Sequence, residues 1–192
     1  MKRVAVFGNA GGGKSTLSRR LAEVTGLPLH VLDVIQFPDG RYRPAEKDGG
    51  KISPEEYSKL HRDILGRDRW IIDGYGSVAS AWERFAAADT LIYIDLPLRI
   101  HYWGVTKRFS GGLFRNPPGW PDDSPVLEST LDSLRVVWLC HRHLTPKYRR
   151  LVSDLAASKR IHHLKTRSAM NDLVLAVRNE QERCGARSKP SE

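Results

Sequence analysis

The sequence is poor in cysteine and has no long apolar run. Cys140 and Cys184 are the only cysteines among 192 residues. Two thiols are too few for a disulfide framework or for a zinc site of four thiolates, and they suit a reducing cytoplasm. No apolar stretch approaches the roughly 20 residues that a membrane-spanning helix needs. We therefore expect a cytoplasmic protein with no membrane segment.

The amino-terminal residues also lack the pattern of an export signal. Apolar residues follow Met1-Lys2-Arg3, but Gly8 interrupts them and Lys14 comes soon after. An export signal needs an uninterrupted apolar region of about 7–15 residues. We expect no export segment here.

Positive charge exceeds negative charge. The chain has 31 Lys and Arg residues against 22 Asp and Glu, a formal net charge of +9. Such an excess fits a basic surface around a phosphate-handling cleft, or a surface that binds nucleic acid. The cationic residues do not form one long tract, which favours the first interpretation and leaves nucleic acid as the alternative.

Short β-branched and aliphatic runs alternate with helical periodicity, a pattern typical of a parallel sheet covered by helices. Strands are predicted at residues 3–7, 29–32, 70–72, 91–94 and 161–164. Helices are predicted at 17–25, 54–65, 97–109, 127–138 and 168–177. The length suits one α/β domain, which we place at residues 1–182, before a polar and disordered tail at 183–192.

The strongest motif is a glycine-rich loop between the first strand and the first helix. Residues 8–15 read Gly-Asn-Ala-Gly-Gly-Gly-Lys-Ser and satisfy the pattern G-x-x-x-x-G-K-[ST]. Glycines let backbone N–H groups converge on phosphate oxygens, and the helix N-terminus adds partial positive charge. We expect Lys14 to reach the β- and γ-phosphates of ATP and Ser15 to ligate Mg²⁺. The residues expected to bind the nucleotide here are Gly8, Gly11, Gly12, Gly13, Lys14, Ser15 and Thr16.

Three aspartates follow predicted strands. Asp73 precedes Gly74, and we expect it to hold Mg²⁺ or its water shell, with a turn-forming Asp-Gly as the alternative. Asp33 ends the second strand, where it either accepts the proton of an acceptor hydroxyl or is an ordinary loop residue. Asp95 precedes Leu96-Pro97, and we expect it to cap the helix that begins at this proline.

Arginines gather around a segment rich in proline and glycine, residues 110–124. Guanidinium groups suit the charge that spreads over a transferring phosphoryl group. We predict that this segment is a mobile lid and that Arg108 and Arg115 bind the nucleotide; the alternative is a static surface loop with solvated arginines. His141, His143, His162 and His163 lack metal-site spacing and are interpreted as surface or cleft residues. The arginines concerned are Arg99, Arg108, Arg115, Arg135, Arg142, Arg149 and Arg150.

With these motifs the sequence resembles the adenylate-kinase-like P-loop kinases, and among them the group named DNA topology modulation proteins, or adenylate kinase and related kinases. The resemblance covers most of residues 1–178. Only the P-loop is specific by itself, and the other segments gain weight from their order and spacing. The matching segments are residues 8–15, Leu32-Asp33, residues 70–74, residues 92–97, Lys107-Arg108 and the helix that ends near Trp138.

The resemblance implies a P-loop three-layer sandwich with a five-stranded parallel sheet in the order 2-3-1-4-5. It places Asp73 beside the P-loop strand and Arg108 on ATP at the lid hinge. Two departures argue against AMP as the acceptor. Adenylate kinases have Gly-Phe-Pro-Arg after this aspartate, where the present chain has Gly74-Tyr75-Gly76-Ser77, and residues 36–50 are unlike the adenylate kinase pattern.

We therefore expect an ATP-dependent phosphotransferase of the nucleoside-monophosphate or small-metabolite kinase type. Lys14, Arg108 and Asp33 are the expected catalytic residues, and Ser15 and Asp73 the expected Mg²⁺ ligands. Its partners would be a nucleotide and a small phosphate acceptor. The alternative is an ATP-binding regulatory protein that acts on DNA or RNA through its basic surface.

Overall fold

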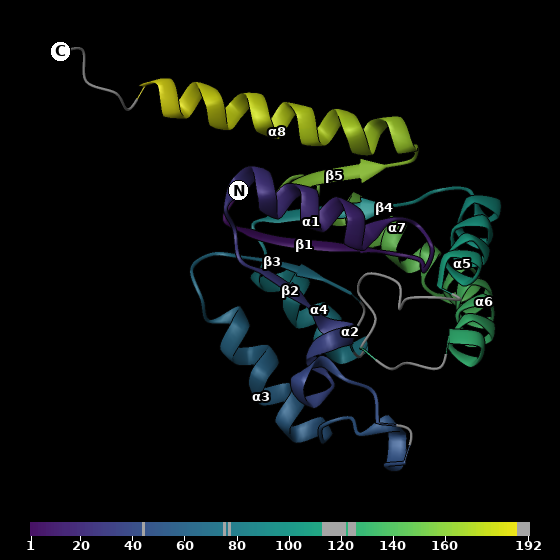
Figure 1. The fold of residues 1–192 in the computed structure, drawn as a ribbon. Helices are drawn as coiled ribbons and strands as arrows, with labels where there is room; N and C mark the ends of the chain where they lie inside the picture. Colours follow the sequence, from purple (N-terminus) through teal and green to yellow (C-terminus); the bar gives the residue numbers. More distant parts are fainter. Residues whose placement is uncertain (44, 75, 77, 113–121, 123–125, 188–192) are drawn as a thin grey trace.

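A sheet of parallel strands forms the centre of the molecule (Figure 1). The computed structural model describes residues 1–43, 45–74, 76, 78–112, 122 and 126–187. The sheet has five strands in the order β2-β3-β1-β4-β5, which confirms the predicted order. The strands are β1 (Arg3–Gly8), β2 (Leu29–Val31), β3 (Trp70–Asp73), β4 (Thr90–Ile94) and β5 (Arg160–Leu164).

The register of the sheet brings the ends of its strands together. Val6 of β1 lies opposite Asp73 of β3, and Asp73 in turn lies opposite Val31 of β2. On the other side of β1, Gly8 pairs with Ile94 of β4. Because all strands are parallel, their carboxyl ends meet at one edge, where α/β folds place their ligands.

Helices cover both faces of the sheet. One face packs against α1 (Lys14–Thr25) and α8 (Arg167–Arg187), and the other against α3 (Pro54–Leu65), α4 (Val78–Ala87) and α7 (Thr145–Leu155). Two further helices, α5 (Leu98–Gly112) and α6 (Val126–His143), lie side by side near the carboxyl edge (Figure 1). This is the predicted three-layer arrangement.

The strand β1 shows why the chain folds in this way. Its apolar run alternates between two cores, because successive side chains of a strand point to opposite faces. Val4 and Val6 pack with the helices α1 and α8. Ala5 and Phe7 face the other core, where the ring of Phe7 lies 4.4 Å from that of Phe85 on α4.

Several elements differ from the prediction. The strand β2 ends at Val31, and a short helix α2 (Leu32–Ile35) follows, so Asp33 lies in a helical turn and does not end the strand. The sequence did not predict α4 or α7. The helix α8 continues past the predicted end at Val177 as far as Arg187, so the first part of the predicted disordered tail is helical. Within the described ranges, no helix has the length and apolar character to cross a membrane.

Candidate functional site

The predicted P-loop connects the central strand β1 to the helix α1. Gly13 precedes the helix in the left-handed conformation, with φ 87°, and Lys14 is the first helical residue. Gly11 also has a positive φ of 71°. Such angles are strained for any residue with a side chain. The glycines therefore let the chain turn from the strand into the helix, whose first N–H groups face the loop.

The helix α5 packs directly on this loop. A side chain on Gly104 would collide with the backbone of Gly11, so the two chain segments touch through their main chains. Nearby, Nδ1 of His101 lies 2.9 Å from the carbonyl oxygen of Ala10. A carbonyl only accepts, so His101 donates this hydrogen bond. Burial, with a contribution from Lys14, lowers the pKa of His101, which keeps the imidazole neutral near pH 7.

Hydrogen bonds of Asn9 and Lys14 also hold the loop in place. The buried Asn9 donates from Nδ2 to the carbonyl oxygen of Val137 on α6, at 2.8 Å, and accepts from the N–H of Ala10. The ammonium group of Lys14 donates to the carbonyl oxygen of Asn9 at 2.9 Å. Two helices, α5 and α6, thus fix the loop conformation, and Lys14 lies across it.

Two carboxylates lie at the same edge of the sheet. Asp73 ends β3, as predicted, and is only 1% exposed. Asp33 is exposed on α2, and its Oδ1 would lie 3.3 Å from a Cβ built on Gly74. The structure therefore brings Asp33 close to the turn that follows Asp73, one strand away from the P-loop strand.

A buried arginine lies behind these carboxylates. Arg84 of α4 is fully buried, and its Nη2 donates to the carbonyl oxygen of Gly74 at 3.2 Å. Burial lowers the pKa of Arg84, whereas nearby groups, including Asp33 and Asp73, raise it. A guanidinium stays charged under these conditions. Sequence reasoning missed Arg84, because nothing in its local pattern distinguishes it from a surface arginine.

A cavity of about 520 Å³ adjoins the P-loop. Its size lies within the range of small-molecule sites. Arg20 of α1 and Asn171 of α8 are joined in its wall by a hydrogen bond of 2.6 Å. The lining residues are Gly11, Gly12, Gly13, Thr16, Leu17, Arg20, Gly104, Lys107, Arg167, Met170 and Asn171.

Not all predicted site residues can be placed. Arg108 lies on α5, but its side chain is outside the described residues, as are Arg115 and most of the predicted lid at 110–124. The residue before it, Lys107, lines the cavity. The prediction for Asp95 was wrong: α5 begins at Leu98, and the carboxylate bonds instead to side chains far away in the sequence.

Comparison with solved structures identifies the fold. Shikimate kinase from Acinetobacter baumannii, in complex with shikimate, matches with a TM-score of 0.56 and 18% identity over 98% of this chain and 96% of that chain. The fold is that of the P-loop kinases. Shikimate kinase from Aquifex aeolicus (TM-score 0.48, 15% identity, 93% and 98% of the two chains) and a gluconokinase from Sinorhizobium meliloti 1021 (TM-score 0.48, 12% identity, 98% and 98%) also match. No protein-family model and no curated protein matches the chain.

Proposed function

We propose that this protein transfers the γ-phosphoryl group of ATP, bound with Mg²⁺, to a small hydroxylated acceptor. One observation carries the proposal: a P-loop held by α5 and α6 lines a nucleoside-sized cavity, and a pair of carboxylates lies at the ends of the strands next to it. The cavity lies on the α1 and α8 side, and the carboxylates belong to the β2–β3 side. The donor would occupy the cavity, and the acceptor would approach the loop from the ends of β2 and β3.

The triphosphate would lie on the N–H groups of residues 11–16, with the ribose and base in the cavity. Lys107 and Arg167 line this cavity and would supply positive charge near the phosphates. Lys14 donates to the carbonyl oxygen of Asn9, and a phosphate oxygen would replace this acceptor. A bond from this ammonium group to an anionic phosphate oxygen joins opposite charges, and it is stronger than a bond to a neutral carbonyl oxygen.

The residues present fit a magnesium ion. Ser15 lies in the first turn of α1, and Asp73 lies opposite Val6 of the P-loop strand. Mg²⁺ is usually held by one or two protein oxygens together with phosphates and water. When bound, the ion would neutralise charge on the phosphates during transfer. Arg84 would keep the turn after Asp73 in place through its bond to Gly74.

Asp33 is the best placed base for the acceptor. It is exposed, and it lies beside the turn that follows Asp73. In the proposed step the acceptor oxygen attacks the γ-phosphorus, the bond from this phosphorus to ADP breaks, and the hydroxyl proton passes to the Asp33 carboxylate. Lys14 would stabilise the charge on the transferring group.

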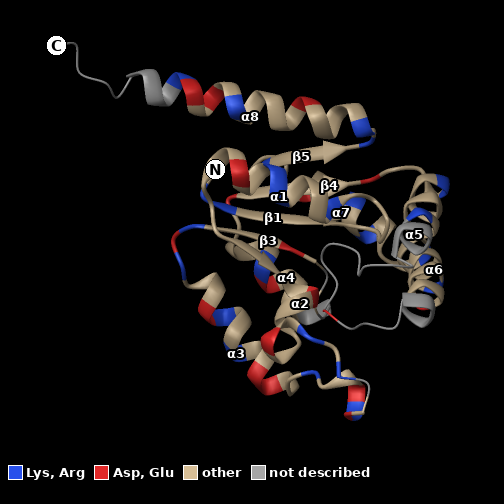
Figure 2. Ribbon diagram, in the orientation of Figure 1, with Lys and Arg blue, Asp and Glu red and all other residues tan. Residues whose placement is uncertain are grey.

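The location of positive charge favours a kinase over a nucleic-acid-binding regulator. Arg20, Lys107 and Arg167 all line the same cavity, the one next to the P-loop. On α3 and α8, basic and acidic residues are interspersed, as Figure 2 shows. A nucleic-acid site would instead call for a continuous basic stripe.

A coupled assay for ADP release tests the proposal. Nucleoside monophosphates, shikimate and other small hydroxylated metabolites serve as acceptors, and Lys14→Ala is the control. We expect acceptor-dependent ADP release from the wild type and a loss of orders of magnitude in the variant. Wild-type turnover by Lys14→Ala would refute the role of this lysine. Absence of ADP with every acceptor, together with duplex DNA binding that falls steeply with salt, would favour the regulator.

A further inference from the structure

A second cavity of about 500 Å³ opens at the carboxyl ends of β4 and β5. It lies on the α6 and α7 side of the sheet, whereas the first cavity lies on the α1 and α8 side, and no described residue lines both. The proposed phosphoryl transfer uses none of its residues. They are Asp95, Leu96, Pro97, Leu98, His141, Arg149, His163 and Lys165.

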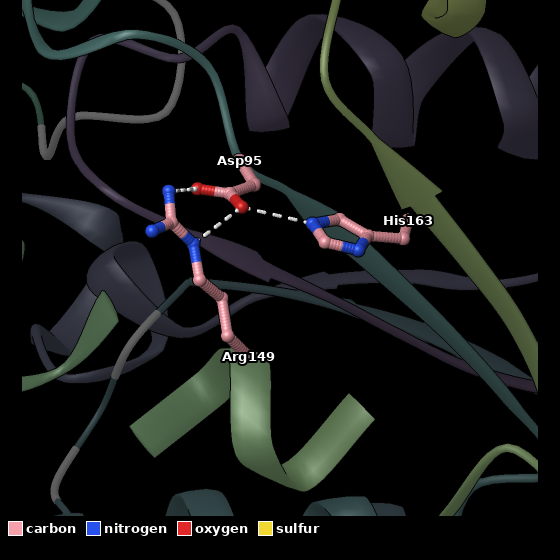
Figure 3. A network of polar contacts seen from close by, with 3 residues as sticks. All are labelled: Asp95, Arg149 and His163. Carbon is pink, nitrogen blue, oxygen red and sulfur yellow. Dashed lines mark hydrogen bonds and ion pairs between the residues drawn. The ribbon is translucent and has the colours of Figure 1, made fainter. Parts of the chain in front are cut away.

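The wall of this cavity contains a polar network around Asp95 (Figure 3). Arg149 of α7 donates from Nε to Oδ2 at 2.8 Å and from Nη2 to Oδ1 at 3.0 Å. His163 of β5 lies 2.9 Å from Oδ2 through its Nε2. Burial would raise the pKa of Asp95, but the hydrogen bonds from Arg149 and His163 hold this pKa below its ordinary value. The carboxylate is therefore ionised, and both of its oxygens are occupied.

This network holds the side chains of Arg149 and His163 in fixed positions. The two bonds from Arg149 form a planar fork, and Figure 3 shows the third nitrogen, Nη1, directed away from the carboxylate. The ring of His163 stacks on Tyr93, with centroids 5.0 Å apart. Side chains that are already ordered lose less entropy when a ligand binds. Asp95 thus holds Arg149 and His163 in place, while its own two oxygens are already used in hydrogen bonds.

The remaining polar groups of the cavity favour an anion. Lys165 and Arg149 carry positive charge, and His141 lines the same cavity. Among the described lining residues the one carboxylate, Asp95, is paired with Arg149, so the lining keeps the net positive charge of Lys165. Guanidinium and ammonium groups in combination are the usual ligands of phosphate. The volume exceeds that of a phosphate ion and leaves room for a small organic body.

We propose that this second cavity binds a phosphate-bearing anion, independently of the nucleotide. The ligand would be either the free phosphate ion or a small phosphate ester, and both present the same phosphate group to the cavity. Lys165 and His141 would contact it from the open side, and the guanidinium of Arg149 from the wall.

Calorimetry with inorganic phosphate tests the site. The full chain is first saturated with Mg²⁺ and a non-hydrolysable ATP analogue, so that phosphate cannot occupy the P-loop; Lys14→Ala provides a second way to weaken that competing site. The test variant is Lys165→Ala with His141→Ala. Neither residue is buried, so the fold should tolerate both changes. The matched control is Lys147→Ala, which removes an exposed positive charge from α7 outside the cavity.

We expect saturable binding to the wild type and to the control, and affinity lower by about tenfold for each lost charge-assisted contact in the test variant. If glycerol 3-phosphate binds more tightly than inorganic phosphate, the cavity binds a phosphate ester. If the two ligands bind with equal affinity, it binds the free ion. The proposal fails if the analogue abolishes phosphate binding, if the test variant binds like the wild type, or if Lys147→Ala weakens binding equally.

Discussion

The contact between α5 and the P-loop allows a sharp test of how the loop is held. A Cβ added to Gly104 would lie 2.8 Å from the carbonyl carbon of Gly11 and 3.1 Å from its Cα, both inside the ordinary contact distance. These atoms belong to the backbone, so no flexible side chain can rotate away. The substitution Gly104→Ala must therefore push α5 and the loop apart.

The size of this effect follows from the packing. Adding a methyl group to a filled contact costs about 1–3 kcal/mol. For a chain of this length, that corresponds to a fall in Tm of roughly 2–12 °C. Nucleotide binding to the variant must restore the present loop geometry, and this costs the same free energy of about 1–3 kcal/mol. The affinity of the variant for an ATP analogue therefore falls by about 5- to 150-fold. The hydrogen bond from His101 to Ala10 would weaken as well.

Differential scanning calorimetry and titration with the analogue measure both quantities. Gly66→Ala is a matched control, because Gly66 has an ordinary helical φ of −71° and the nearest atom to a Cβ there is 3.6 Å away. We expect the control to be neutral or stabilised by less than about 1 kcal/mol. Wild-type Tm and wild-type affinity in Gly104→Ala would refute the direct contact of α5 with the loop.

Three further predictions concern charge. Asp73→Asn should raise the Mg²⁺ concentration needed for half-maximal activity, because the carboxylate charge is lost while its size is kept; an unchanged midpoint would make Asp73 a turn residue only. Burial lowers the pKa of His30, His61, His101 and His162 below 6.5, so the unfolded chain takes up more protons than the folded one as the pH falls through and below this value. Urea denaturation at pH 7.5 and 5.5 should show lower stability at pH 5.5, and equal stability would contradict the buried neutral state. Asp95→Asn should lower the urea midpoint by the equivalent of about 1–3 kcal/mol, since the fork to Arg149 loses its charged acceptor; a wild-type midpoint would show that this network does not stabilise the fold.

Local patterns predicted the features that depend on neighbouring residues. The P-loop could be read from residues 8–15, because the glycines, the lysine and the flanking apolar strand are contiguous in the sequence. The helix α3 could be read from Ser53, whose hydroxyl accepts from the N–H of Glu56 as the capping pattern requires. The order of the strands, by contrast, came from the family resemblance, since short apolar runs do not specify their neighbours.

Periodicity predicted the helix α6 but not the side that faces inward. The i, i+4, i+7, i+11 spacing of Leu127, Leu131, Leu134 and Trp138 predicts a helix with one apolar face, yet Leu131 and Trp138 are 59% and 48% exposed. Within residues 130–143 of α6 the buried positions are Thr130 and Val137, each one residue before an exposed apolar residue, and the carbonyl of Val137 accepts from Asn9 of the P-loop. The orientation of α6 is thus set by its contact with the loop and with α5, which a single-helix pattern does not contain.

Asp95 shows why the second cavity could not be predicted from local rules. A proline two residues later made a helix cap the natural interpretation, because capping depends only on the next few positions. Its actual partners, Arg149 and His163, are 54 and 68 residues away in the sequence. They meet Asp95 only because β5 pairs with β4 in parallel and α7 leads into β5 from the same side of the sheet. The bonds from Arg149 and His163 keep this buried carboxylate ionised, and the carboxylate in turn holds both side chains in the wall of the second cavity.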